Sequence, residues 1–340
     1  MTRLDEKLAH IRAGRYQRKD FIIADAKDPD MGPSIVSCGP ARLKDGSSTR
    51  NRTRGEFLDQ IQAIVEQDIV DVMLTSVSNL ERLVERGVYR TSAVKPAIRA
   101  NDATDIWVMR GATYAQKPSR PYRSAKLSRV MWGSLTPKPG APVTGTDLGL
   151  YSLTFNNDLD ADLASLEAFA AFRDEAAALG FSYFLEVFNP NVPTGIAAEV
   201  LPHYINDCIQ RCLAGLTLAE RPLFLKVAYN GPRALEEMAS YDPSLVVGVL
   251  GGGAGTTRDC FELIAQAERH GARVALFGRK INLAESPLAM VSFMRAVADG
   301  ALAPSEAVKA YHAALRKEGI KPHRDLSADD QITEATLKLG

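Results

Sequence analysis

RPLFLKVAYNG (residues 221–231) is the first of three apolar runs that decide the predicted fold, and it is followed by SLVVGVLGGGAGTTRD (244–259) and ARVALFGRKIN (272–282). Each run has the pattern of a β-strand that ends in a polar or glycine-rich turn, and each is followed by a helical pattern. Repeated strand–helix units predict a parallel sheet, and these three are typical of the closing units of a (β/α)8 barrel. Catalytic residues in such barrels lie where the strands end, so the same runs indicate where to look for a site.

The first half of the chain supplies the remaining strands. Five more strand-like runs occur, at residues 21–28, 69–76, 93–102, 148–156 and 182–189. The total of eight predicts an α/β protein with a (β/α)8 TIM-barrel fold, in a single domain that spans residues 1–340. We expect the barrel itself at about residues 20–318, an extra N-terminal helix covering its bottom, and a polar C-terminal tail over residues 319–340.

Residues 109–147 form the least regular part of the chain, an insertion after the third strand that is rich in proline, arginine and lysine. One interpretation is a mobile basic flap that meets an anionic substrate. The other is an excursion used for subunit contacts, or a solvated loop, and we prefer this second interpretation.

Composition excludes several classes of protein. Lys plus Arg and Asp plus Glu both number 41, so the net charge is zero and the basic excess of a dedicated nucleic-acid-binding protein is absent. No apolar run approaches the roughly 18–20 residues that span a membrane, and the charged N-terminus has no apolar core like that of a secretory signal. The four cysteines are scattered, which favours buried thiols in a reducing cytoplasm over a metal site, even for the i, i+4 pair Cys208 and Cys212.

Lys226 is the strongest catalytic candidate. It is flanked by Leu223, Phe224, Leu225 and Val227 on the sixth predicted strand. An ammonium group in apolar surroundings loses hydration, so its pKa falls and a nucleophilic amine becomes accessible near neutral pH. A Schiff-base lysine needs this property, because the free amine must attack a carbonyl carbon. The alternative is a lysine at the strand mouth whose stem is buried and whose head reaches water.

Two glycine-bearing turns follow the last two strands. Gly251, Gly252 and Gly253 would let the backbone approach a ligand closely, with Thr256 and Thr257 capping the next helix, and Gly278 with Arg279 follows the eighth strand. Barrel enzymes often bind phosphate between the loops after strands 7 and 8. Glycine turns also serve as plain connectors. Two of them downstream of a buried lysine predict a phosphate site.

Residues 221–318 resemble the archaeal-type class I fructose-bisphosphate aldolases and their bacterial relatives, including the autoinducer-2 phosphate thiolase. The matching segments are FLKVAYNG (224–231), VLGGGAG (249–255) and LFGRKINLAESPLAMVSFMRAVADG (276–300), and FLEVFNP (184–190) is similar to the strand that precedes the lysine strand in that group. The resemblance implies that Lys226 is the Schiff-base lysine. It also implies that Gly252, Gly253, Gly278 and Arg279 lie near a substrate phosphate.

The first half departs from the family pattern. Strand 1 ends ADAKDPDMG (24–32), where the family has an acidic residue followed by His or Gln and Gly, and strand 4 ends LTFNND (153–158) without the tyrosine-bearing turn of the aldolases. For proton transfer the candidates are therefore Asp25, Asp28, Glu186 and Tyr229. Glu186 is favoured because it ends the strand next to Lys226.

Two further expectations concern single residues. Asp25 and Asp28 are three residues apart on an extended strand end, so we expect one of them to point into the site and the other to cap a loop. Tyr229 has the alternative of packing under its turn. Arg99, at the end of strand 3, is a candidate for substrate binding, although ordinary loop hydrogen bonding would explain it equally well.

No metal or other cofactor is predicted. The five histidines fall in predicted helices or in the tail, so the strand-end ligands of a zinc-dependent aldolase are missing. GxxxxGK[ST] does not occur, and VLGGGAG lacks the spacing of a dinucleotide-binding motif.

The prediction is thus a cytoplasmic class I aldolase, a lyase that cleaves or forms a carbon–carbon bond of a small, phosphorylated, sugar-like substrate through a Schiff base on Lys226. One alternative is a transaldolase or thiolase-type transferase on the same lysine. Another is a non-catalytic barrel that binds sugar phosphates. The resemblance implies a homo-oligomer, and we expect neither a nucleic acid nor a membrane as a partner.

Overall fold

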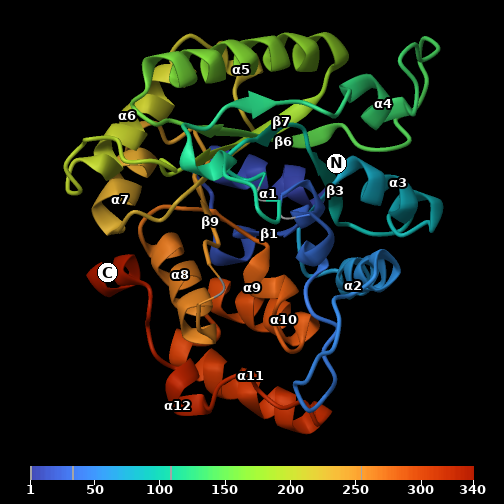
Figure 1. Cartoon of the computed structure of the whole chain (residues 1–340), viewed down its shortest axis with the longest axis vertical. Helices are drawn as coiled ribbons and strands as arrows, with labels where there is room; N and C mark the ends of the chain where they lie inside the picture. Colours follow the sequence, from blue (N-terminus) through green and yellow to red (C-terminus); the bar gives the residue numbers. More distant parts are fainter. Residues whose placement is uncertain (1, 33, 108, 254) are drawn as a thin grey trace.

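Eight parallel strands close into a barrel in the order β1–β2–β3–β6–β7–β8–β9–β10, with β10 paired to β1 (Figure 1). The structure, a computed structural model, describes residues 2–32, 34–107, 109–253 and 255–340. The barrel strands are Ile22–Lys27 (β1), Val72–Thr75 (β2), Lys95–Arg99 (β3), Leu148–Thr154 (β6), Ser182–Phe188 (β7), Leu225–Val227 (β8), Gly248–Leu250 (β9) and Val274–Phe277 (β10). Each lies within one of the eight predicted runs, so the predicted (β/α)8 fold is confirmed.

Helices alternate with the strands and form the outer layer of the barrel. They are α2 (Arg54–Gln67), α3 (Val77–Glu85), α4 (Leu127–Trp132), α5 (Leu159–Leu179), α6 (Leu201–Leu213), α7 (Pro232–Tyr241), α8 (Thr257–Arg269), α9 (Arg279–Asn282), α10 (Pro287–Ala298), α11 (Pro304–Glu318) and α12 (Leu326–Asp329). Thr256 is the N-cap of α8, as the sequence predicts, because its hydroxyl accepts a hydrogen bond from the backbone N–H of Asp259.

Strand alternation divides the buried residues into two clusters. In the inner cluster, alternate residues of nearly every barrel strand point their apolar side chains into the barrel. The rings of Phe184 and Phe224 stack within it, with centroids 4.5 Å apart. Gly248 belongs to this crowded interior: a Cβ atom there would lie 2.6 Å from Cβ of Val274, so only glycine fits. A polar side chain that follows the inner register therefore points into the barrel, and one in the outer register faces the helices.

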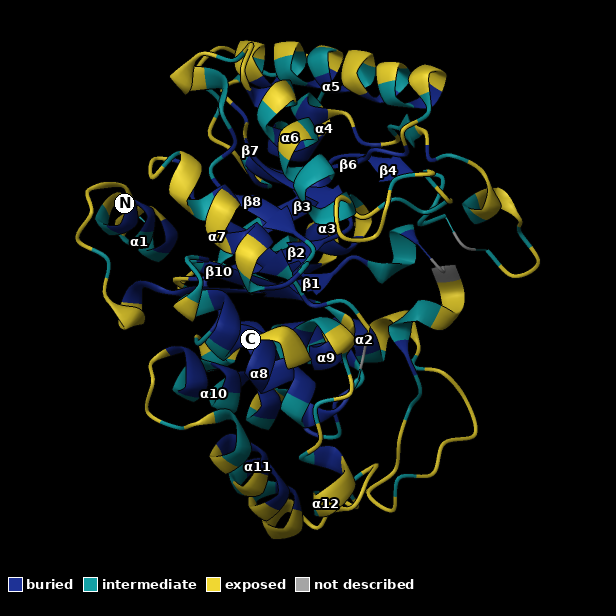
Figure 2. Cartoon of the chain, turned by 90° about the vertical axis from the view of Figure 1, so that its left-hand side faces the viewer, coloured by how far each residue is buried: buried dark blue, intermediate teal, exposed yellow. Residues whose placement is uncertain are grey.

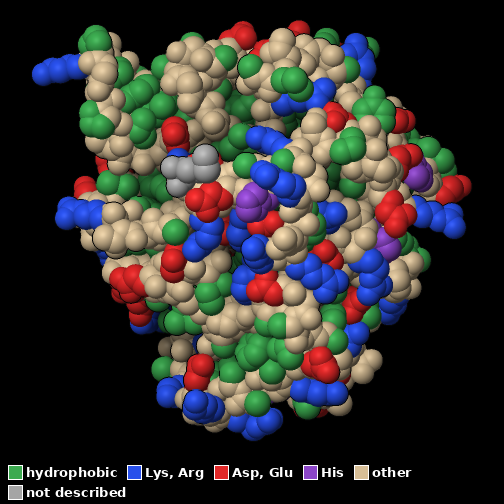
Figure 3. All heavy atoms as spheres, turned by 180° about the vertical axis from the view of Figure 1, so that it is seen from behind, with side chains coloured by type: hydrophobic (Ala, Val, Ile, Leu, Met, Phe, Trp, Pro, Cys, Tyr) green, Lys and Arg blue, Asp and Glu red, His purple; other side chains and the backbone are tan. Residues whose placement is uncertain are grey.

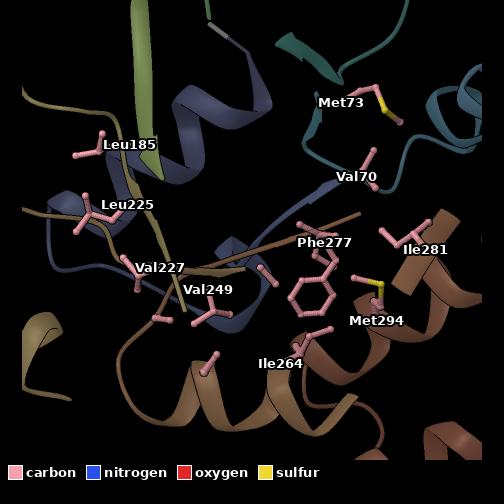
Figure 4. Packing of buried hydrophobic residues seen from close by; sticks show 14 of the residues in the cluster. Val70, Met73, Leu185, Leu225, Val227, Val249, Ile264, Phe277, Ile281 and Met294 are labelled. Carbon is pink, nitrogen blue, oxygen red and sulfur yellow. The ribbon is translucent and has the colours of Figure 1, made fainter. Parts of the chain in front are cut away.

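The outer cluster fills the space between the barrel and its helices. In Figure 4, Phe277 of β10 points toward Ile264 of α8 and Met294 of α10, and Val249 lies nearby. All four side chains are buried. This packing fixes α8, α9 and α10 against the ends of β9 and β10, where the glycine turns lie.

The extra N-terminal helix covers the bottom of the barrel. Helix α1 (Arg3–Arg12) buries Leu4, Leu8 and Ile11, and these side chains join the inner cluster of the barrel (Figure 2). Lys7 fixes the helix by donating to Asp71 (2.8 Å) and to the backbone oxygen of Phe21 (3.1 Å). With its bottom closed, the barrel is open only at the carboxyl ends of its strands.

The insertion after strand 3 carries more structure than its composition indicates. It contains helix α4 and the short strand β5 (Pro121–Tyr122), which pairs antiparallel with β4 (Asp102–Ala103). Asn191, in the loop after β7, donates to the backbone oxygens of Ala115 (2.9 Å) and Lys117 (2.7 Å). The insertion is thus attached to the rim of the barrel.

Residues 319–340 pack against α8. The carboxylate of Asp259 accepts hydrogen bonds from the backbone N–H groups of Thr333 (2.7 Å) and Glu334 (3.2 Å), and Gln266 donates to the oxygen of Leu337 (2.8 Å). Within this stretch, we call residues 325–340 the C-terminal segment. It includes α12 and a 3-10 turn at Ala335–Leu339. It is a folded part of the barrel rim.

Basic and acidic side chains lie side by side over the face shown in Figure 3, in keeping with the net charge of zero. Within the described residues, no helix has the length and apolar character needed to cross a membrane.

Candidate active site

Lys226 and Glu186 form the centre of the candidate site. They are register partners on the adjacent strands β8 and β7, and both follow the inner register of the barrel. The Nζ atom of Lys226 lies 2.5 Å from Oε1 of Glu186, and both side chains are more than nine-tenths buried. The sequence placed Lys226 in apolar surroundings, but the structure gives it a carboxylate partner. A proton can therefore pass directly between the two groups.

Arg99 extends this pair into a network across the barrel interior. Its Nη2 lies 3.2 Å from Oε2 of Glu186, its Nη1 donates to the hydroxyl of Ser152 (2.8 Å), and its Nε donates to Asp28. Ser152 in turn donates to Oε2 of Glu186 (2.9 Å). Lys226, Glu186, Ser152, Arg99 and Asp28 thus form one buried chain of charged and polar groups.

Charge pairing sets the protonation of the outlying groups in this network. Burial raises the pKa of Asp28, but the positive charges of Arg99 and Lys226 outweigh it, and the pKa is lowered overall. Burial alone would lower the pKa of Arg99, whereas Asp28 and Glu186 raise it. Asp28 and Arg99 are therefore both charged near neutral pH and form a buried ion pair.

Asp102, which begins β4 above Arg99, has a different environment. Burial raises its pKa to about 6, and Asp28 and Asp30 add to the rise while Arg99 opposes it. Its Oδ1 has no hydrogen-bond partner among the described residues. Asp102 is thus a carboxyl group at the barrel rim that titrates close to neutral pH.

Asp28, not Asp25, is the strand-1 carboxylate that reaches the site. Asp25 and Lys27 follow the outer register of β1, as Ile23 does, and they form an ion pair (3.3 Å) that is fully buried between barrel and helices. Burial raises the pKa of Asp25 to about 6, with Lys27 opposing the rise. This corrects the expectation that Asp25 could act in proton transfer, since the barrel wall separates it from Lys226.

A cavity of about 440 Å³, here called the mouth cavity, lies at the ends of β7, β8 and β9. Gly251 and Gly252 line it, together with Phe188, Asn189 and Asn230. Gly252 has φ +61°, a left-handed conformation that favours glycine. The predicted glycine turn therefore borders open space at the end of the strand that carries Lys226, where Ala228 also lines the cavity.

Other predicted ligand residues are arranged differently. The Gly253 position borders open space but is not part of the mouth cavity, and Ala254, next to it, lies outside the described residues. Tyr229 borders the mouth cavity, but its hydroxyl turns to α8 and donates to Gln266 (2.8 Å). It packs under its turn, which was the alternative reading of this residue.

Gly278 and Arg279 differ in what they face. Gly278 packs against β1, where a Cβ atom would lie 2.8 Å from the backbone oxygen of Ala26. The side chain of Arg279 is exposed and lines a second cavity on the outer side of α9, not the mouth cavity. The glycine turn after β9 therefore borders the mouth cavity. The side chain of Arg279, in the turn after β10, lines the second cavity instead.

Two residues of this region were missed by the sequence reasoning. Ser152 bridges Arg99 and Glu186, and its inner register on the predicted strand 148–156 could have identified it. Lys280 has a side chain that is only 1% exposed, and its Nζ contacts the carboxylate of Glu334 at 3.1 Å. Glu334 also lines the mouth cavity. A carboxylate from the C-terminal segment thus lies at the turns where a substrate phosphate was expected.

No family model matches the sequence, and no curated protein matches it either. Solved structures do match, and the fold is that of the archaeal-type Schiff-base fructose-bisphosphate aldolases. An archaeal fructose 1,6-bisphosphate aldolase aligns with a TM-score of 0.61 at 12% identity, over 87% of this chain and 99% of that one.

Two further structures support the same fold. The fructose-bisphosphate aldolase from Slackia heliotrinireducens aligns with a TM-score of 0.62 at 12% identity, over 92% of this chain and 91% of the other. An archaeal aldolase whose catalytic lysine is covalently bound to the carbinolamine intermediate of the substrate aligns with a TM-score of 0.60 at 13% identity, over 87% and 100% of the two chains. At these identities the likeness concerns the fold.

Proposed function

We propose that the protein is a class I aldolase in which Lys226 forms a Schiff base with the carbonyl group of a small, phosphorylated, sugar-like substrate. The observation that carries this proposal is the buried contact of 2.5 Å between Lys226 Nζ and Glu186 Oε1, on two strands whose ends border an open cavity. A nucleophilic lysine needs both a proton acceptor and room for its carbonyl partner.

The reaction begins with proton transfer from Lys226 to Glu186, which leaves a neutral amine. The amine attacks the substrate carbonyl carbon and forms a carbinolamine. Protonated Glu186 then donates its proton to the departing hydroxyl group, so that water leaves and an iminium ion remains. Glu186 is again a carboxylate, and it stabilises the positive charge of the iminium.

Cleavage follows from the same carboxylate. Glu186 accepts the proton of the substrate hydroxyl group on the far side of the bond to be cleaved, the carbon–carbon bond breaks, and its electron pair moves to the iminium nitrogen. An aldehyde leaves and an enamine stays on Lys226. Protonation of the enamine carbon and addition of water then release the ketone and restore the lysine.

The expected phosphate position is supported by the glycine turn after β9. Gly251 and Gly252 border the mouth cavity, and the buried cation Lys280 lies close by, with Glu334 as its present partner. Backbone N–H groups and a buried cation are the usual partners of a phosphoryl group. We propose that the phosphate takes the place of the Glu334 carboxylate at Lys280.

The test is borohydride trapping followed by intact-mass spectrometry, with dihydroxyacetone phosphate, pyruvate and glycolaldehyde as probes. We expect one adduct per chain with at least one probe, mapped by peptide analysis to Lys226. Lys226→Met should abolish the adduct. Lys95→Met is the matched control, because it removes another ion-paired lysine of the barrel, at the beginning of β3 and away from the mouth cavity, and should leave the adduct in place.

If no probe gives an adduct at Lys226, the Schiff-base proposal fails and a binding function becomes the better reading. A transferase on the same lysine would be recognised by transfer of the trapped fragment to an aldehyde acceptor. The cytoplasmic location and the homo-oligomeric state stay predictions. Light scattering at micromolar concentration would test the oligomeric state.

A further inference from the structure

A second cavity of about 510 Å³ lies on the outer side of α9, and we refer to it as the outer cavity. Three segments that are distant in the sequence form its walls: the loop after β1 at residues 42–46, the beginnings of α8 and α9, and residues 321–324 of the chain's last part. It shares no lining residue with the mouth cavity. The outer cavity is thus distinct from the mouth cavity, although Lys280, the cation proposed for the substrate phosphate, belongs to its lining.

Cationic side chains from all three walls line the outer cavity. Arg42 comes from the loop after β1, Arg279 from α9, and Lys321 from the segment that follows α11. Across the described residues, none of these three has a carboxylate within 4.0 Å of its charged nitrogen atoms. Unpaired cations that converge on one cavity repel each other, so their arrangement favours an anion between them.

The other charged side chains of the outer cavity have partners of their own. Lys280 contacts Glu334, and Arg324 lies 3.8 Å from Asp329. Glu285 accepts hydrogen bonds from the backbone N–H of His323 (2.6 Å) and from the hydroxyl of Tyr311 (2.9 Å). Asp45 accepts from the N–H and hydroxyl groups of Ser47 within its own turn. Asp45, which interacts electrostatically with Lys321, and Glu285 are the two carboxylates of the lining, against the five cations Arg42, Arg279, Lys280, Lys321 and Arg324, so the cavity keeps an excess of positive charge.

The number and kind of these cations identify the class of ligand. A phosphate monoester carries up to two negative charges and three terminal oxygens that accept strong hydrogen bonds. Two guanidinium groups and one ammonium group supply charged donors of the type that bind phosphoryl oxygens. A single carboxylate would leave most of these donors unused.

We propose that the outer cavity is a second anion site that binds the phosphate group of a small phosphorylated molecule through Arg42, Arg279 and Lys321. The site is joined to the mouth cavity by one ion pair: Lys280 lines the outer cavity and its partner Glu334 lines the mouth cavity. An anion bound by the outer cavity would therefore lie beside the cation that we assign to the substrate phosphate.

His323 provides a local probe of this site, because it lines the outer cavity and the chain has only five histidines. The experiment is a titration of the full-length protein with inorganic phosphate at fixed pH and ionic strength, followed by the imidazole proton signal of His323 in NMR spectra. His323→Gln assigns the signal. We expect a saturable shift of the His323 signal, and chloride at equal ionic strength should not produce it.

The double variant Arg42→Gln/Lys321→Gln should weaken this phosphate affinity about tenfold or more, since it removes two charged donors. The matched control is Lys309→Gln/Arg316→Gln, which makes the same change in net charge on α11, outside the cavity. The control should change the affinity less than twofold. The proposal is overturned if His323 does not respond to phosphate, or if the double variant and the control respond alike.

A second measurement separates two sources of the phosphate. Trapping of dihydroxyacetone phosphate on Lys226 is compared between Arg42→Gln/Lys321→Gln and the control Lys309→Gln/Arg316→Gln. Weaker trapping in the first variant alone would assign the outer cavity to the phosphate of the substrate, and equal trapping would assign it to a separate ligand. The His323 titration does not depend on the aldolase proposal, so failure of one leaves the other intact.

Discussion

Glu186 uses its two oxygens for different partners: Oε1 contacts Lys226, whereas Oε2 lies 3.2 Å from Nη2 of Arg99. The hydroxyl of Ser152 also donates to Oε2. The carboxylate is therefore held in one orientation, with a single oxygen left to exchange a proton with the lysine.

Replacing Arg99 by Met should destabilise the fold strongly. The change leaves Asp28 and Glu186 buried with one cation fewer, and breaking a buried ion pair in this way costs about 3–5 kcal/mol. Urea unfolding measures the change. Arg86→Met is the control, because its ion pair with Asp59 is at the surface and should be worth under about 1 kcal/mol. Equal losses in both variants would contradict the network.

Glu186→Gln should slow the formation of the Lys226 adduct while leaving the fold intact. The amide has nearly the same shape but cannot accept the lysine proton, and general acid–base groups typically contribute about 10²–10⁴-fold in rate. Single-turnover trapping measures the effect. Ser152→Ala, which removes one hydrogen bond from the same carboxylate, should slow the reaction by less than about tenfold. A Glu186→Gln protein that reacts at the original rate would exclude Glu186 as the base.

Asp102 should make stability depend on pH between about 4 and 6. Its pKa in the folded state is raised to about 6, above the ordinary value of 3.8, so the folded protein binds more protons than the unfolded chain in this interval. The contribution of Asp102 to stability is therefore present at low pH and is lost as the pH rises through 6. In Asp102→Asn the urea midpoint should fall less between pH 4 and pH 7 than it does in the unaltered protein, and an identical fall would refute the assignment.

Asp25 and Lys27 should behave as a coupled pair. Lys27→Met alone leaves a fully buried carboxylate without its cation, which should cost about 3–5 kcal/mol. The double variant Asp25→Leu/Lys27→Met removes both charges and should recover most of that loss. Urea midpoints of the two single variants and the double variant form the cycle. Additive losses would show that the two side chains do not interact.

Glu334→Gln should favour phosphorylated ligands at the mouth cavity. The substitution removes the negative charge that Lys280 now contacts. The dihydroxyacetone phosphate concentration that gives half-maximal trapping should therefore fall about threefold to tenfold. Dihydroxyacetone without phosphate should show no such change. Glu81→Gln, an exposed substitution on α3, is the control. Equal improvement for both ligands would mean that Glu334 does not compete with phosphate.

The fold was predictable because strand patterns are local. Each of the eight strands is a short apolar run followed by a turn, and parallel connections leave little choice of topology. The proximity of Lys226 and Glu186 followed as well, since consecutive strands of a barrel are neighbours. Inner and outer register could be assigned only where a strand's end was certain. The exact end of strand 1 was not certain, and a shift of one residue reverses the direction of a side chain. The sequence therefore could not decide which of Asp25 and Asp28 points into the barrel.

The remaining features depend on contacts between distant segments. Asp259 of α8 holds the backbone of Thr333 and Glu334, and nothing in the local sequence of either segment indicates this partner. Likewise, Arg279 follows β10 directly, yet its side chain lines the outer cavity with Arg42, more than 200 positions earlier. Such contacts arise from the packing of the whole barrel and cannot be derived from spacing along the chain.

The position of Glu334 has a consequence for how the protein matures on the ribosome. All eight strands and Lys226 are synthesised before the segment that carries Glu334, so the barrel can close while one wall of its mouth is still missing. During that interval Lys280 lacks the carboxylate that neutralises it in the finished protein. The barrel scaffold can thus be complete before the mouth cavity is, and the segment that carries Glu334 and Thr336 gives that cavity its final charge and shape.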